Sequence, residues 1–275
     1  MKSFARLPRQ YATFEGHRVA YVDIGNGPTL LLLHGLGGTA DFWQPVAELL
    51  QPNFRLIIPD LLGFGFSDKP RLTYSLARHM GAILAVLRAA QATSLHTLIG
   101  HSAGCVIAVA LLASGQVQTT QVVLAAAPFP SPRYPVRQEL VTRAFFNTLL
   151  DKPRIARFDD AIWRTLWPVL RWIGMWRIPD YLHGGLAGFM EYSADSYYGT
   201  VNEVLLRTDI EPLLPALQSI PILLIYGTTD ETVPLSHGHR LQALLPNATL
   251  IQPLGGHYAV IHEALPILNA WLTSG

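Results

Sequence analysis

Three residues whose side chains can act together in covalent catalysis lie far apart in the sequence. Ser102 is at the centre of residues 100–104, Gly-His-Ser-Ala-Gly; Asp230 follows it by 128 positions, and His257 comes 27 positions later. A serine hydroxyl becomes a nucleophile when a histidine removes its proton, and a carboxylate orients that histidine and stabilises its charged form. The three residues are therefore suited to two-step acyl transfer.

The segment around Ser102 has the pattern of a strand, a tight turn and a helix. Residues 95–99 form an apolar run typical of a buried strand, and an apolar helical stretch follows at residues 105–112. A G-x-S-x-G turn between two such elements is a nucleophile elbow, in which the flanking positions have no room for large side chains. Gly100 and Gly104 meet this demand, so we expect the hydroxyl to point out of the turn.

The other two residues also follow apolar runs. Asp230 comes after the predicted strand 221–226, and His257 comes after the predicted strand 248–252. Loops at the carboxyl ends of parallel strands open on the same face of a sheet. We therefore expect Asp230 and His257 to approach Ser102 at that face.

Each of these two assignments has a competing interpretation. Asp230 could instead cap the helix that follows it, because Asp-Glu-Thr-Val-Pro is a plausible helix start. The rivals of His257 are His237, His239 and His262, all of which fall in helical stretches. His257 is favoured because it follows a Gly-Gly pair directly after the last predicted strand.

Apolar runs and helical stretches alternate along most of the chain, which predicts an α/β fold. Residues 11–24 read as a hairpin that turns at Glu15-Gly16, and six further strands are predicted at 29–33, 54–58, 95–99, 121–126, 221–226 and 248–252. The six runs are nearly continuous in Leu, Ile and Val, as expected when helices cover both faces of a parallel sheet. We predict a mostly parallel, eight-stranded sheet.

With these motifs the chain resembles the α/β-hydrolase superfamily, from about Tyr11 to about Leu272. The order serine, acid, histidine is that of the superfamily. Residues 30–38, Leu-Leu-Leu-Leu-His-Gly-Leu-Gly-Gly, look like its H-G-x-G loop, and residues 59–68 look like its loop after the next strand. The resemblance implies an oxyanion hole formed by the backbone N–H groups of Leu36 and Ala103.

The alternation of strands and helices breaks between Phe129 and about Leu206. In resembling proteins an insert at this place forms a helical cap over the active site, which predicts a core domain of residues 1–128 and 207–275 and a cap of residues 129–206. Two pairs of tryptophans in the insert are each spaced four apart and share a helix face. We predict that they line an apolar substrate pocket; alternatively they hold the cap together or face a lipid surface. These tryptophans are Trp163, Trp167, Trp172 and Trp176.

A different motif overlaps the predicted oxyanion loop. Residues 35–40 fit G-x-G-x-x-A after a strand, and Asp60 ends the next strand, which together form a passable dinucleotide-binding fingerprint. This interpretation is disfavoured because a hairpin precedes the strand and because it leaves Ser102, Asp230 and His257 unexplained. Two-step acyl transfer by these three residues needs no organic cofactor and no metal, so we expect neither.

Composition excludes several kinds of partner. The net charge is +1 and only 14% of the 275 residues are charged, which argues against nucleic acid. The single cysteine, Cys105, rules out an internal disulfide, and we expect it to be a buried small residue.

The N-terminal residues have no apolar signal-peptide core and no apolar run reaches membrane-spanning length. We expect a soluble, cytoplasmic protein without stable membrane insertion.

The resemblance implies a carboxylesterase-like serine hydrolase whose small-molecule substrates are carboxylic esters of small to medium apolar acyl groups. Serine at the elbow disfavours dehalogenase and epoxide hydrolase activity, since resembling enzymes of those types carry an aspartate there. Acylglycerol lipases, C–C bond hydrolases, lactonases and perhydrolases remain as alternatives with the same three residues. A non-catalytic accessory or ligand-binding protein remains as an alternative of a different class.

Overall fold

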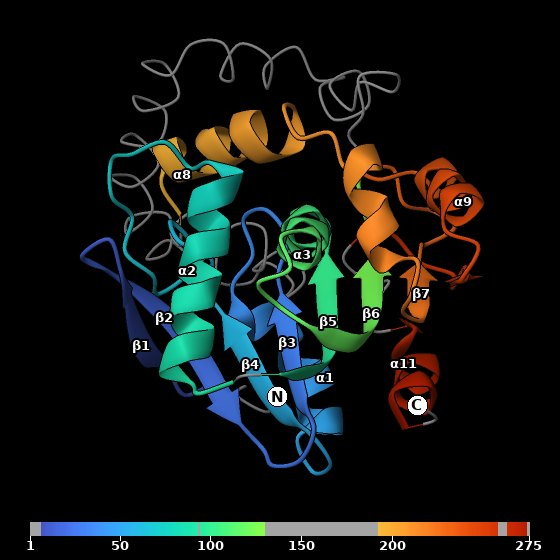
Figure 1. Ribbon diagram of the computed structural model, residues 1–275, viewed down its shortest axis with the longest axis horizontal. Helices are drawn as coiled ribbons and strands as arrows, with labels where there is room; N and C mark the ends of the chain where they lie inside the picture. The colour runs from blue at the N-terminus through green and yellow to red at the C-terminus, as the bar shows by residue number, and fades with distance from the viewer. Residues whose placement is uncertain (1–6, 93, 130–191, 258–262, 274–275) are drawn as a thin grey trace, which may run out of the picture.

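The computed structural model describes residues 7–92, 94–129, 192–257 and 263–273 of the chain. The strands in these residues form one eight-stranded sheet in the order β1-β2-β4-β3-β5-β6-β7-β8 (Figure 1). The strands are β1 (Gln10–Phe14), β2 (His17–Ile24), β3 (Thr29–Leu33), β4 (Arg55–Pro59), β5 (Leu95–His101), β6 (Thr119–Ala125), β7 (Ile222–Ile225) and β8 (Ala248–Ile251).

The sheet is mostly parallel, as predicted. Strands β1 and β2 form an antiparallel hairpin, β2 pairs antiparallel with β4, and all the remaining pairs are parallel. The hairpin turns at Glu15 and Gly16, whose positive φ angles of 49° and 78° give a turn that fits the twist of paired strands. Residues Leu30–Leu33 of β3 are fully buried, which explains why this strand is an unbroken run of leucine.

Strands β5 and β6 extend beyond their predicted bounds because polar residues join the ladder. Strand β6 begins at Thr119 rather than at residue 121, and the hydroxyls of Thr119 and Thr120 both donate to the backbone oxygen of His96, at 3.0 and 2.7 Å. Strand β5 continues through His101, which pairs with Ala125. The predicted runs were shorter because they counted apolar residues alone.

Helices cover both faces of the sheet, as predicted. Helices α2 and α3 contact each other on one face, and α1 contacts α11 on the other (Figure 1). The helices and helical turns are η1 (Ala40–Trp43), α1 (Gln44–Leu50), α2 (Leu76–Ala89), α3 (Ala103–Ala113), α8 (Ala194–Thr200), η3 (Val201–Leu205), η4 (Glu211–Leu217), α9 (Leu235–Leu244) and α11 (Leu265–Thr273).

Helix α3 is the most deeply buried of these elements. Every residue from Ala103 to Leu112 is buried, so the helix has no polar side. A helix that is apolar all round belongs in a core. Its position beside β3 and β5 places its first turn, with Ala103, at the carboxyl ends of these strands.

Most of the predicted cap, residues 130–191, lies outside the described residues, together with Trp163, Trp167, Trp172 and Trp176. The returning part of the insert is described, and α8 begins there with a capping box in which Ser193 and Ser196 bond to each other's backbone. The predicted domain bounds at 129 and 206 therefore stay predictions.

Among the described helices, none combines the length and apolar character needed to cross a membrane.

The backbones of α3 and β3 approach each other too closely for a side chain to lie between them. A Cβ at Gly104 would collide with the backbone oxygens of Leu33 and His34, and a Cβ at Gly100 would lie 2.8 Å from the Cα of Cys105. Both flanking glycines of the elbow are therefore required by backbone packing.

Gly104→Ala should lower the free energy of unfolding by about 3 kcal/mol, because the obstacle is backbone in the centre of the sheet and cannot turn aside. Gly115→Ala is the matched control: its φ of +69° makes alanine strained, but nothing lies within 4 Å of the added Cβ. That variant should lose about 1 kcal/mol. Urea denaturation measures both, and equal losses would contradict the packing argument.

Candidate active site

Ser102 lies in the sharp turn between β5 and α3, with φ 50° and ψ −122°. A residue other than glycine rarely adopts a positive φ, and holding it there costs about 1–3 kcal/mol. Two backbone hydrogen bonds of 2.9 Å maintain the turn: Ser102 N–H donates to the Ala125 oxygen, and Cys105 N–H donates to the Ser102 oxygen. The turn is thus held in a strained conformation by the strand beside it.

The loop after β3 lies directly against the serine. A Cβ at Gly35 would be 2.9 Å from the Ser102 Cβ. Gly38 N–H donates to the Gly35 oxygen at 3.1 Å, which closes a turn, and Gly37 has a φ of +72° at its third position, where glycine is favoured. Leu36 is the second residue of this turn, so its backbone N–H lies close to the elbow.

Ala103 supplies a second backbone N–H at the same place. It is the first residue of α3, and the N–H groups of a helix's first turn have no acceptor within the helix. The two predicted oxyanion donors, Leu36 and Ala103, are therefore one residue away from Gly35 and Ser102 respectively, and a Cβ at Gly35 would lie against the Cβ of Ser102.

Asp230 and His257 lie together at the carboxyl ends of β7 and β8. The Nδ1 atom of His257 is 2.8 Å from Oδ2 of Asp230. The other carboxylate oxygen, Oδ1, accepts from Thr232 N–H at 2.8 Å and from Val233 N–H at 2.9 Å. The carboxylate therefore caps the following turn and orients the histidine at the same time, so the two interpretations of Asp230 from the sequence are compatible.

The environment keeps Asp230 ionised. Burial alone would raise the pKa of its carboxyl, but hydrogen bonds from His257 and from two backbone N–H groups outweigh burial, so its pKa lies below the usual value. The side chain of Asp230 is fully covered in its ion pair with His257.

His257 is also in contact with the elbow itself. The Nε2 atom of His101 is 3.1 Å from the His257 backbone oxygen, and the two imidazole rings are 4.9 Å apart between centroids. Since His101 directly precedes Ser102, the structure brings all three predicted catalytic residues to one place. All three residues are buried, with whole-residue exposed fractions of 8% for Ser102, 7% for Asp230 and 9% for His257.

The other histidines that the sequence offered have different surroundings. His237 is buried in α9 and its Nδ1 accepts from Phe129 N–H at 2.8 Å, while His239 is exposed and His262 lies outside the described residues. His34 is fully buried: its Nδ1 bonds the Gly35 oxygen at 2.8 Å and its Nε2 accepts from a backbone N–H at 3.0 Å. Burial lowers the pKa of His34, so it is a neutral, structural side chain.

Asp60 belongs to a buried network that holds the oxyanion loop. Its carboxylate accepts from the backbone N–H of Ala40 at 2.6 Å and of Phe66 at 3.0 Å, and from Arg9 Nε at 3.1 Å. Arg9 also approaches Asp41 at 3.1 Å. Asp60 is thus occupied by protein partners, which gives the loop after β4 a structural role and leaves the dinucleotide interpretation without its acidic residue.

Aromatic side chains that were not predicted from the sequence lie beside the oxyanion loop. Tyr192 and Tyr197, from the returning part of the insert, stack with ring centroids 4.8 Å apart. A Cβ at Gly37 would lie 3.4 Å from Tyr192 and 3.5 Å from Tyr197, so both rings cover the turn that carries Leu36. The grouping of three tyrosines within residues 192–198 is the sequence signal that could have identified them.

Cys105 is buried at the start of α3, as expected. Its Sγ lies 3.3 Å from the Ala125 backbone oxygen, and burial raises the pKa of the thiol well above its usual range. A protonated, covered thiol is a poor nucleophile. The elbow therefore presents Ser102 and not Cys105.

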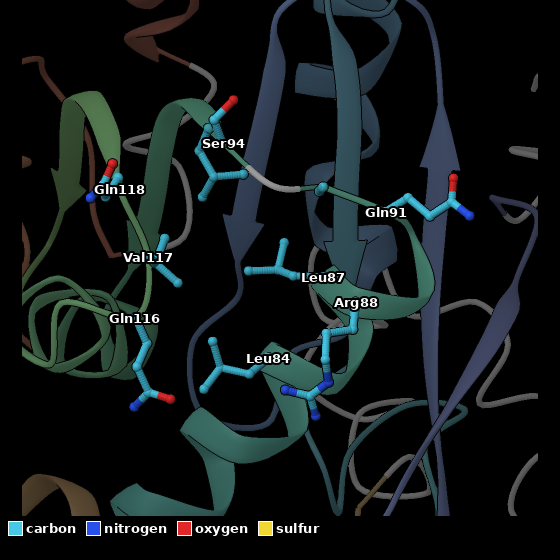
Figure 2. Close-up of a pocket in the computed structure, with 10 residues that line it drawn as sticks. Leu84, Leu87, Arg88, Gln91, Ser94, Gln116, Val117 and Gln118 are labelled. Carbon is cyan, nitrogen blue, oxygen red and sulfur yellow. The ribbon is translucent and has the colours of Figure 1, made fainter.

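The described residues also form a hollow of about 600 Å³ at the opposite end of the sheet. Leu84, Leu87 and Arg88 of α2 face residues 116–118 across it, next to the start of β5 (Figure 2). The parallel strands β5 and β6 begin near this hollow and end at the elbow. It is therefore separate from the candidate active site by the length of a strand.

A family model described as alpha/beta hydrolase fold matches residues 28–264. The chain belongs to this family. The match includes the elbow, Asp230 and His257, and it agrees with the sheet order and the helical layers described above. The superfamily resemblance inferred from the sequence is thereby confirmed.

Several members and solved structures are similar to this α/β hydrolase over most of its length. The putative carbamate hydrolase RutD of Caulobacter is 28% identical over 86% of this chain and 88% of that protein. A thermophilic esterase from Thermogutta terrifontis has a TM-score of 0.77 at 20% identity, covering 97% of this chain and 98% of its own. An esterase from Rhodococcus has a TM-score of 0.71 at 26% identity, with the same coverage.

The lowered pKa of Asp230 predicts how its contribution to stability depends on pH. Because the folded-state pKa lies below the unfolded value of about 3.9, ionisation favours the folded α/β hydrolase above pH ~4, and this contribution is lost as pH falls through the folded pKa. Asp230→Asn should therefore be destabilising at pH 7, with a difference from wild type that shrinks below pH ~4.

Urea denaturation between pH 3 and pH 7 tests this dependence. Glu231→Gln, which removes one charge from the exposed neighbouring side chain, is the control and should stay within about 0.5 kcal/mol of wild type at pH 7. A wild-type advantage over Asp230→Asn that grows towards acid would show that the carboxylate is not stabilised by these hydrogen bonds.

Proposed function

We propose that this α/β hydrolase cleaves carboxylic esters through an acyl-enzyme on Ser102. The observation that carries the proposal is the 2.8 Å hydrogen bond between His257 and Asp230 beside a serine held at positive φ. Such an arrangement supplies a base, an orienting carboxylate and an outward nucleophile at one place. Family membership supports hydrolysis, and the esterases among the similar structures support an ester as substrate.

In the proposed mechanism, the Ser102 Oγ attacks the ester carbonyl carbon while Nε2 of His257 takes its proton. Asp230 holds the Nδ1–H tautomer of His257 and stabilises the imidazolium. The imidazolium then protonates the leaving alcohol as the tetrahedral intermediate collapses to the acyl-enzyme. Water, deprotonated by the same histidine, attacks the acyl-enzyme and releases the acid and the free serine.

The negative charge of both tetrahedral intermediates falls on the former carbonyl oxygen. In the proposal, the backbone N–H groups of Leu36 and Ala103 donate to this oxygen. Preorganised donors of this kind contribute about 3–4 kcal/mol each to the stability of the transition state. The contact between Gly35 and Ser102, and the network around Asp60, support this role because they hold the loop in place before substrate binds.

The proposed substrates have small to medium apolar acyl groups. We propose that the insert, residues 129–206, forms a cap over the site and that its tryptophans line the acyl pocket. The described part of the insert supports this placement, because Tyr192 and Tyr197 lie over Gly37 of the oxyanion loop. Carbamates are a second candidate substrate class, favoured by the similarity to a putative carbamate hydrolase.

The three residues should act as one unit. Ser102→Ala and His257→Ala should each lower kcat for p-nitrophenyl esters by about 10⁴–10⁶-fold, the double variant should be little worse, and Asp230→Asn should cost about 10⁴-fold or somewhat less. Cys105→Ala is the control and should retain kcat within a few-fold. A Ser102→Ala enzyme with a tenth of wild-type activity would refute the assignment.

Labelling with a fluorophosphonate separates catalysis from the non-catalytic alternative. The probe should label the wild-type protein and the Cys105→Ala variant but not Ser102→Ala. A folded wild-type protein that resists the probe and hydrolyses no ester or carbamate would instead be a binding or accessory protein.

A panel of p-nitrophenyl esters with graded acyl chains tests the pocket. Each added methylene should improve kcat/KM by up to about 0.8 kcal/mol of transition-state binding until the pocket is full. Replacing a pocket tryptophan by alanine should move the best chain length while acetate turnover stays nearly intact. The variants are Trp163→Ala, Trp167→Ala, Trp172→Ala and Trp176→Ala.

Two results would contradict the pocket. If none of the four folded variants shifts the chain-length optimum, the tryptophans serve only the internal packing of the insert. A jump in rate on emulsified substrate would favour a lipase whose aromatic residues face a lipid surface.

A further inference from the structure

His101 is a buried imidazole next to the proposed nucleophile, and the mechanism above gives it no step. It ends β5 and is only 1% exposed. Its Nε2 lies 3.1 Å from the backbone oxygen of His257, a residue 156 positions away in the sequence. An oxygen can only accept, so Nε2 carries the proton and donates.

The ring of His101 is fixed in a neutral state. Burial, with a smaller contribution from the nearby His257, lowers its pKa to about 3. A neutral imidazole has one N–H, and here that N–H is committed to the His257 oxygen. The ring also packs against Phe42, with centroids 4.6 Å apart and an angle of 31° between the planes.

The backbone before His257 packs against the loop that follows β7: a Cβ at Gly227 would collide with the Gly255 oxygen and lie 3.3 Å from the Gly256 oxygen. Thr228 N–H donates to the Pro253 oxygen and Thr229 N–H donates to the Gly255 oxygen, each at 3.1 Å. Among the described residues, the atom near a Cβ at Gly256 is the backbone oxygen of Thr229, at 3.9 Å. The carbonyl of His257 itself is held by His101.

We propose that His101 is a positioning residue that holds the general base, His257, at a fixed position relative to the nucleophile, Ser102. Its Nε2–H fixes the carbonyl of His257, so that the His257 ring stays between Asp230 and Ser102. His101 and Ser102 are consecutive residues at the end of one strand. The hydrogen bond therefore links the carbonyl of the base to the residue next to the nucleophile. The proposal rests on the ester hydrolysis proposed above.

The same ring touches the third part of the site. A Cβ at Gly35 would lie 3.0 Å from Nδ1 of His101 and 2.9 Å from Cβ of Ser102. His101 is thus in contact with the oxyanion loop as well as with the base. A substitution of His101 can therefore remove the hydrogen bond to His257 and also disturb the packing of the ring against the oxyanion loop. The test must distinguish the effect of the lost hydrogen bond from the effect of the changed side-chain volume.

Glutamine and methionine provide this separation because they have nearly the same length and shape, and only glutamine has an N–H to donate. His101→Met and His101→Phe should lower kcat for p-nitrophenyl acetate by about 10- to 100-fold with KM nearly unchanged, as expected for a displaced base. His101→Gln should recover kcat to within about five-fold of wild type. Equal kcat in the glutamine and methionine variants would overturn the proposal.

A matched control comes from a second buried histidine. His79 of α2 is also 1% exposed, and its Nε2 lies 3.0 Å from the Thr200 hydroxyl. His79→Phe should lower the melting temperature but keep kcat within about two-fold. A comparable loss of kcat in this variant would assign the effect at His101 to general loosening of the core.

Two further readouts keep the outcomes distinct. The downfield proton resonance of the His257–Asp230 hydrogen bond should broaden in His101→Met and return in His101→Gln, which a purely structural role would not produce. Fluorophosphonate labelling of Ser102 should slow in proportion to kcat but reach completion. Absence of labelling in the wild type would reject the proposed function, whereas normal labelling and kcat in His101→Met would reject only the positioning role.

The glutamine variant decides the question if neither apolar variant folds. A folded His101→Gln should keep both the downfield resonance and kcat within five-fold of wild type. Loss of the resonance, or a 100-fold lower kcat in that variant, would show that an N–H at this position is not sufficient to hold the base.

Discussion

The geometry of the site depends on one steric constraint, the close approach of the first turn of α3 to the end of β3. Gly104 lies against the backbone oxygens of Leu33 and His34, so the backbone of the turn between β5 and α3 has no room to shift. The conformation of Ser102 follows from this, because the chain must reverse within two residues. The same approach brings the loop after β3 against the serine, and thereby places the first N–H of a helix beside a glycine-rich turn.

Few of the ionisable side chains around this close approach carry a charge. His34 and His101 are buried and neutral, so neither competes with the carboxylate for protons or repels a protonated His257. Asp230 retains its charge because hydrogen bonds replace the water that it lost. Asp60 is buried as well, but it is paired with Arg9 and backbone donors, as a buried charge requires.

Local sequence patterns predicted the sheet, the elbow and the positions of Asp230 and His257, since each depends on a strand followed by a specific turn. They did not predict which polar groups bond across the sheet. The pairs Arg9–Asp60 and His101–His257 join residues 51 and 156 positions apart, and nothing in either segment specifies its partner. The observed start of β6 differs from the predicted one for the same reason, since Thr119 joins this strand through a hydrogen bond to His96. The role of the cap tryptophans stays a prediction.

Strands β6 and β7 pair directly although residues 126–221 intervene between them, with Val122 opposite Ile222 and Ala125 opposite Ile225. The entropy lost in closing a connection grows only with the logarithm of its length, by about 0.6 kcal/mol for each doubling. An insert at this place can therefore be lengthened, shortened or exchanged at little cost to the sheet. The scaffold thus separates the proposed catalytic residues, which follow β5, β7 and β8, from a connection whose length and sequence can vary independently of them.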